Sequence, residues 1–203
     1  MWELLRSGDP FMILLALTSV VGLTFIIERG VALRWSKVIP AGVKEGAENC
    51  RALEDADQLK GLCAVEPSAL SRLLSAAVEH QHWTRIENAD TLQTLARHEI
   101  LQLERGLVVL EIIVGIAPLL GLVGTIHGLI TSFSNLGGAS MGDNVAFARG
   151  IALALNATLM GLLIAIPSLI AWSYYNKKVE SIAVEMETLC DEFLRGLYRR
   201  KKK

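Results

Sequence analysis

Apolar residues are gathered into three long runs in this chain of 203 residues. They extend from Pro10 to Ile27, from Ile112 to Gly142 and from Gly150 to Asn176. The second and third runs each exceed the roughly 20 residues with which an α-helix crosses the hydrocarbon core of a bilayer. The pattern therefore predicts an all-α integral membrane protein with three transmembrane helices.

The first run resembles a secretory signal peptide in position but not in its flanks. Arg6 is the only basic residue before it, whereas Arg29, Arg34 and Lys37 follow it. A signal peptide carries its positive charge in front of the apolar region, and a stop-transfer segment carries it behind. We expect a retained transmembrane helix.

Residues 31–105 show the apolar spacing of helices that face a core. Pro67 and Ser68 open one such run, which contains Leu70, Leu73, Leu74, Ala77 and Val78. No Gly or Pro interrupts the sequence between Trp83 and Arg105, so we expect this second run to continue into the next membrane span as one long helix. Its predicted apolar face consists of Ile86, Ala89, Leu92, Leu95, Ala96, Ile100 and Leu103.

Basic residues predict the orientation of the chain in the membrane. Ten of the 20 Lys and Arg residues lie between Arg29 and Arg105, and eight lie between Lys177 and Lys203, although the net charge is only −1. Loops rich in Lys and Arg stay in the cytoplasm. The predicted segments are a periplasmic N-terminus (1–9), a first span (10–30), a cytoplasmic helical domain (31–105), a second span (106–134), a periplasmic loop (135–148), a third span (149–175) and a basic cytoplasmic C-terminal helix (176–203).

The sequence contains no pattern typical of an enzyme. It lacks a nucleophile and base pair, a metal-ligand cluster and a phosphate-binding loop. Cys50, Cys63 and Cys190 all fall on the predicted cytoplasmic side and outside any CxxC pair, so we expect free thiols. We expect no catalytic residue, metal, cofactor or nucleic-acid partner.

Small and hydroxylated residues form a stripe along each of the last two spans. Their spacing of three or four residues places them on one helix face. Such stripes have two interpretations: close packing of helices with the threonines bonded to backbone, or the lining of a polar path among several helices, where a hydroxyl can both donate and accept. The stripes consist of Gly121, Thr125, Gly128 and Ser132 in the second span, and of Ala154, Thr158, Gly161, Ala165 and Ser168 in the third.

Ionisable residues are almost absent from these spans. Glu111 lies near the cytoplasmic end of the second, where we expect a vestibule residue or an intersubunit partner of Arg105 or, less favoured, Arg149. His127 is turned about 200° around the helix from Thr125, because successive residues are about 100° apart, so we expect it to face a neighbouring helix. A proton carrier in the middle of the membrane would have to come from another chain.

Two segments resemble the signature spans of the MotA/TolQ/ExbB proton channel family. Residues 117–130 read APLLGLVGTIHGLI and residues 152–171 read ALALNATLMGLLIAIPSLIA, in the family's order and about thirty residues apart. Three spans with a cytoplasmic domain after the first are similar to the ExbB/TolQ branch. One departure is Leu153, where many relatives have a glutamate, which leaves Asn156 as a polar residue of interest.

The resemblance implies a multi-pass homopentamer in a bacterial inner membrane that encloses the single transmembrane helices of an ExbD- or TolR-like partner. The partner's aspartate would carry H⁺, with Thr125 and Thr158 facing the pore, and proton flow would drive work on the cell envelope. Pro118 and Pro167 would kink or loosen their helices. The alternatives are a subunit of the same family that powers motility or secretion, and a non-conducting oligomeric scaffold in the lipid bilayer.

Overall fold

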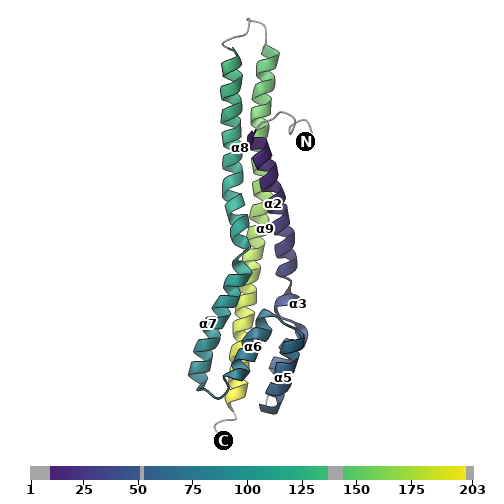
Figure 1. Cartoon of the computed structure of the whole chain (residues 1–203), viewed down its shortest axis with the longest axis vertical. Helices are drawn as coiled ribbons and strands as arrows, with labels where there is room; N and C mark the ends of the chain where they lie inside the picture. The colour runs from purple at the N-terminus through teal and green to yellow at the C-terminus, as the bar shows by residue number, and fades with distance from the viewer. Residues whose placement is uncertain (1–9, 51–52, 137–143, 200–203) are drawn as a thin grey trace. The chain divides into compact units, whose positions relative to one another are not determined.

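The protein is helical throughout the part of the chain that the computed structural model describes, residues 10–50, 53–136 and 144–199. Figure 1 shows its helices in chain order. Their bounds are α2 Pro10–Ala32, α3 Trp35–Val38, α4 Ala41–Asn49, α5 Leu53–Val65, α6 Ala69–Glu79, α7 Arg85–Glu104, α8 Leu107–Leu136 and α9 Asn144–Arg199. The all-α fold class is therefore confirmed.

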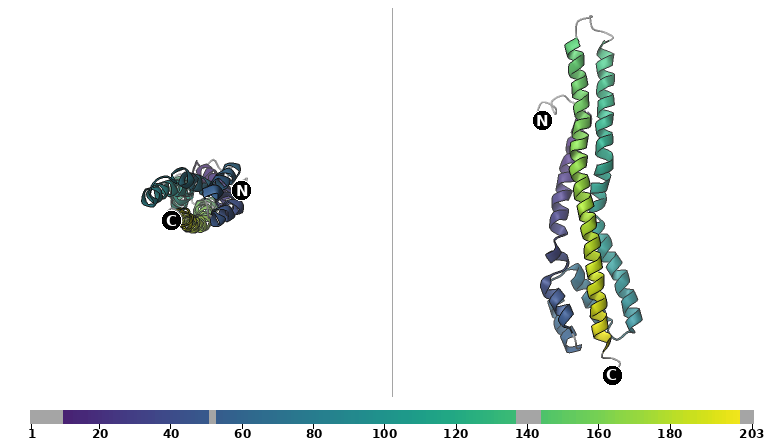
Figure 2. Two further views of the ribbon diagram at one scale, coloured as in Figure 1. Left: turned by 90° about the horizontal axis from the view of Figure 1, so that it is seen from below. Right: turned by 180° about the vertical axis from the view of Figure 1, so that it is seen from behind.

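Three helices are long and apolar enough to cross a membrane: α2, α8 and the apolar part of α9. They overlap the three predicted runs; the predicted N-terminal segment (1–9) and residues 137–142 of the second run lie outside the described residues. Helix α9 continues for 56 residues, from the third span into the basic C-terminal segment as far as Arg199 (Figure 2).

The chain divides into two compact units. The membrane unit comprises residues 1–28 and 106–174, and the second unit comprises residues 29–105 and 175–203. The membrane unit packs α2, α8 and the first half of α9 around a small core made of Met12, Leu15, Ile113, Ala117, Ala157, Ile164 and Ala165. Large apolar side chains elsewhere on these helices are exposed, as expected of helices surrounded by lipid or by other membrane helices.

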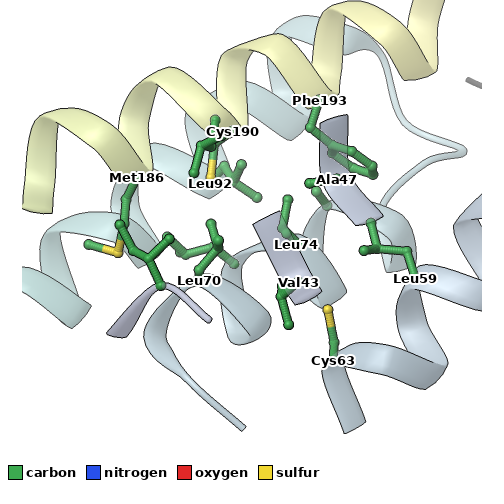
Figure 3. Close-up of a cluster of buried hydrophobic side chains, with 14 of the residues drawn as sticks. Val43, Ala47, Leu59, Cys63, Leu70, Leu74, Leu92, Met186, Cys190 and Phe193 are labelled. Atoms are coloured by element: carbon green, nitrogen blue, oxygen red, sulfur yellow. The ribbon is translucent and has the colours of Figure 1, made fainter. Parts of the chain in front are cut away.

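The second unit has an apolar core of its own. Met186, Cys190 and Phe193 project from α9 toward side chains of the short helices, among them Leu70 and Leu74 of α6 (Figure 3). All three cysteines are buried free thiols. Burial, together with the nearby negative charge of Glu187, raises the pKa of Cys190 to about 12.

Helix starts in this unit follow recognisable capping chemistry. The Ser68 side chain accepts a hydrogen bond from the Ser71 amide at the start of α6. Thr84 and Glu87 form a complete capping box at the start of α7. As predicted, Leu70, Leu73, Leu74, Ala77 and Val78 are buried on one face of α6.

Two expectations for α7 are wrong in detail. The helix ends at Glu104 and α8 begins at Leu107, so the predicted continuous helix is interrupted at residues 105–106. The predicted apolar face is also too wide, because Ile86 is 74% exposed and Leu95 is 36% exposed. Leu92 is buried, and Ala89, Ala96, Ile100 and Leu103 pack against the core.

Candidate functional site

The two helices with small-residue stripes, α8 and α9, touch backbone to backbone. A Cβ atom at Gly161 would lie 2.6 Å from the carbonyl oxygen of Ala117, and one at Gly121 would lie 2.8 Å from that of Ala157. Both distances are too short for any side chain, and a backbone atom cannot swing away. Glycine at these two positions therefore allows the close contact on which the site is built.

Thr125 of α8 and Thr158 of α9 meet within this contact. Their hydroxyl groups are hydrogen-bonded to each other. The Thr125 hydroxyl lies 3.0 Å from the carbonyl oxygen of Ala154 and 3.1 Å from that of Gly121. The Thr158 hydroxyl lies 3.2 Å from the same Gly121 oxygen. The two half-buried threonines thus form a cluster of four oxygen atoms that connects the helices.

This cluster has more acceptor capacity than donor capacity. Each threonine hydroxyl has one hydrogen and two lone pairs, and each carbonyl oxygen has two lone pairs. When both hydroxyls donate to neighbouring oxygen atoms, lone pairs remain to accept a hydrogen from water or from a protonated carboxyl group. The pair can therefore hold a proton-bearing group in place without being ionised itself.

The other stripe residues extend the same helix contact. A Cβ atom at Gly128 would lie 2.8 Å from that of Ala154, so these two positions face each other. Ser132 donates to the carbonyl oxygen of Gly128 at 2.8 Å. Ala165 belongs to the core that also contains Met12 and Leu15 of α2. The contacts of the stripes within one chain are therefore those of close helix packing. That the same residues line a pore stays a prediction.

Ser168, at the end of the α9 stripe, faces α2. Its hydroxyl donates to the carbonyl oxygen of Ile164 at 2.8 Å. It lies 3.5 Å from where a Cβ atom at Gly22 would be, so the α2 contact also uses a glycine.

Three polar residues of interest lie apart from the threonine pair. Glu111 is exposed on α8, and the described residues provide it with no ion pair within the chain. Asn156 is half-buried on α9. The His127 ring is exposed and lies 5.3 Å from the ring of Phe11 on α2, centroid to centroid.

Both prolines lie inside helices. Pro118 is within α8 and Pro167 is within α9, and each helix continues on both sides. A proline has no N–H group to donate to the carbonyl four residues earlier, so each leaves one backbone acceptor without its helical donor.

Sequence reasoning missed the backbone partners of the threonines. It named Gly121 as a stripe residue but not its carbonyl oxygen as the shared acceptor, and it left Ala117 and Ala157 out of the contact. The spacing of Ala117, Gly121, Gly124 and Gly128 was an available signal, because small residues four and three apart allow close helix approach. No group of three His, Cys, Asp or Glu side chains that could hold a metal ion occurs in the described ranges.

Residues 65–188 match the MotA/TolQ/ExbB proton channel family. The chain belongs to this family. The match covers more than half of the chain and includes α8, the threonine pair and most of α9.

Individual relatives agree with this assignment. A protein of Methanothermobacter thermautotrophicus described as an ExbB homologue is 29% identical over 189 residues, covering 92% of this chain and 67% of the relative. The biopolymer transport protein ExbB of Neisseria meningitidis is 27% identical over 205 residues, covering 92% of each chain. The Tol-Pal system protein TolQ of Haemophilus influenzae is 36% identical over 101 residues, covering 50% of this chain and 44% of TolQ.

Proposed function

We propose that this chain is the channel subunit of an ExbB/ExbD- or TolQ/TolR-like complex that couples the proton motive force to work on the cell envelope. The observation that carries the proposal is the paired hydroxyls of Thr125 and Thr158 in a membrane unit of a proton channel family member. No covalent chemistry is involved. The energy available is about 2.3 kcal/mol per proton per 100 mV of membrane potential, plus the contribution of the pH gradient.

The site requires a proton carrier from another chain. Glu111 and His127 are the ionisable side chains in the apolar part of α8, and neither contacts the threonine pair in the described structure. A protonated carboxyl group on a partner helix would fit the free lone pairs of the hydroxyls, because its O–H can donate to them. Once ionised, the carboxylate would need a threonine hydroxyl to turn from its present acceptor and donate to it instead. The proposed partner is therefore a single-span, ExbD- or TolR-like protein with an aspartate at membrane depth.

We further propose that the chain forms a homopentamer around the partner helices in a bacterial inner membrane. The exposed apolar faces of α2, α8 and α9 are compatible with both lipid and neighbouring subunits. The driven process is envelope maintenance or energised transport, and H⁺ is the ion. A related complex could use the same subunit for motility or secretion, since the partner selects the process.

Native mass spectrometry of the full-length chain, purified after co-expression with the small membrane proteins encoded near it, tests this proposal. We expect five copies of this chain with two copies of a partner that has one span and one membrane aspartate. An oligomer that never retains such a partner would contradict the proposal and favour the non-conducting scaffold, in which the close α8–α9 contact has a packing role alone.

A further inference from the structure

Apart from the basic C-terminal residues 195–203, the second unit has two short basic segments, both next to the predicted membrane spans. Residues 29–37 and 175–178 contain five basic residues and no acidic residue, whereas residues 38–102 contain six basic and ten acidic residues. Residues 179–194 contain five acidic residues and no basic residue. The positive segments adjoin the apolar parts of α2 and α9, where the chain leaves the predicted spans.

Contacts inside this unit bring the two basic segments to the same level. A Cβ atom at Gly30 would lie 2.9 Å from the Tyr175 hydroxyl oxygen, so α2 and α9 are in contact there. Farther along both segments, Lys44 forms an ion pair with Glu185. The two segments therefore advance through the unit in the same direction. Arg34 and Lys177 follow this first contact by four and two residues, respectively.

Several side chains of these segments are exposed. Arg34 and Lys37 are exposed, and no acidic partner for either is found among the described residues. Trp35, between them, is 41% exposed. Lys177 forms an ion pair with Glu180 at 3.0 Å, but both side chains are largely exposed and water competes for them.

We propose that Arg34, Trp35, Lys37 and Lys177 form a binding surface for the headgroups of acidic phospholipids in the adjoining leaflet. A guanidinium group matches the geometry of a phosphate, and juxtamembrane Lys and Arg residues are attracted to anionic lipid. An indole ring at the level of the headgroups anchors such a surface. Acidic residues outnumber basic ones in residues 38–102 and 179–194, so these two segments are disfavoured as contacts for an acidic headgroup.

Lipid retention by the purified full-length protein in detergent tests this surface. Native mass spectrometry would compare binding of phosphatidylglycerol with that of phosphatidylcholine of the same acyl chains. We expect phosphatidylglycerol to bind preferentially, and the double variant Arg34→Gln/Lys37→Gln to bind it about 25-fold more weakly, at about fivefold for each basic residue removed. The matched control Lys60→Gln/Arg97→Gln removes the same charge from exposed positions in the acidic region, and it should bind like the wild type.

Equal weakening in both double variants, or equal binding of both lipids by the wild type, would overturn the proposal. The charge-conserving variant Arg34→Lys/Lys37→Arg should retain the preference. If the Arg34→Gln/Lys37→Gln variant does not accumulate in the membrane, the salt dependence of phosphatidylglycerol retention by the wild type tests the proposal instead. Retention of phosphatidylglycerol should fall between about 50 mM and 500 mM salt, because exposed charges are screened, and unchanged retention would contradict the surface.

Discussion

Gly161 is a single residue whose lack of a side chain allows α8 and α9 to touch. The substitution Gly161→Ala would place a Cβ atom 2.6 Å from the Ala117 carbonyl oxygen, so the helices would have to separate. We expect the free energy of unfolding to fall by about 1–3 kcal/mol, as for other overpacked contacts. Thermal unfolding in detergent, followed by circular dichroism, measures the change.

Gly115 provides the matched control for this substitution. It lies on the same pair of helices, but a Cβ atom there would have nothing within 4 Å. Because alanine favours a helix over glycine by up to about 1 kcal/mol, Gly115→Ala should leave stability unchanged or raise it slightly. Similar losses for both variants would show that the α8–α9 contact is not as close as described.

At the residue scale, the sequence predicted which side chains share a helix face but not what they bond to. Thr125 and Thr158 could be placed on their stripes by period alone. Their shared acceptor, the Gly121 carbonyl oxygen, depends on how closely and at what register two helices pack, and no periodicity within one helix specifies that. Oligomer contacts depend on the same kind of information from other chains.

Tyr198, near the end of α9, connects that helix to the corner between α6 and α7. Its hydroxyl accepts a hydrogen bond from the Asn88 amide at 3.1 Å and lies within 3.3 Å of the His80 and Trp83 carbonyl oxygens, to which it can donate. Asn88 is fully buried and also donates to the Ala77 carbonyl at 2.9 Å. One phenol group thus joins three elements.

The substitution Tyr198→Phe removes this connection and keeps the ring. We expect the free energy of unfolding to fall by about 1–3 kcal/mol, because a buried amide hydrogen on Asn88 loses its acceptor. Amide hydrogen exchange should rise at the α6–α7 corner first. The change Thr188→Val removes an exposed hydroxyl that bonds only to its own helix, so it serves as the control. Equal exchange in both variants would contradict the connecting role of Tyr198.

At the element scale, long apolar helices were predictable and their ends were less so. The continuous α9 follows from an apolar run that passes directly into a helical polar one. The break between α7 and α8 falls at Gly106, whose low helix propensity was a visible signal. The contact that stabilises the break could not be predicted from the sequence. The Leu103 carbonyl at the end of α7 accepts a hydrogen bond from Arg29, which is 74 residues away in the chain.

At the scale of the whole molecule, the distribution of basic residues predicts the orientation of the chain. Ser134, at the end of α8, should be periplasmic, and Val184 of α9, which is 64% exposed, should be cytoplasmic. A membrane-impermeant maleimide applied to sealed spheroplasts should therefore label the Ser134→Cys variant. It should label the Val184→Cys variant only after lysis. The native cysteines are buried and provide a low background. The reverse labelling pattern would show that the chain has the opposite orientation in the membrane.

The three membrane spans could be predicted from the apolar composition of their segments. The helical class of the second unit could be predicted from the helical spacing of its apolar residues. Three apolar runs specify three spans, and the α6 face specifies part of a core. The division of the chain between two units could not be predicted in the same way. It depends on contacts between segments far apart in sequence, such as Lys44 with Glu185.

The most direct test of the central claim is proton flux through the full complex, with its co-expressed partner, reconstituted into liposomes. We expect Thr158→Val to reduce flux by at least about tenfold, which corresponds to about 1.4 kcal/mol in the barrier, without loss of assembly. Thr158→Ser, which keeps the hydroxyl, should retain most of the flux. Thr131→Val is the control, because Thr131 is exposed and bonds only to the His127 carbonyl of its own helix. Flux that is unchanged in Thr158→Val, or lost equally in Thr131→Val, would contradict a proton path through the threonine pair.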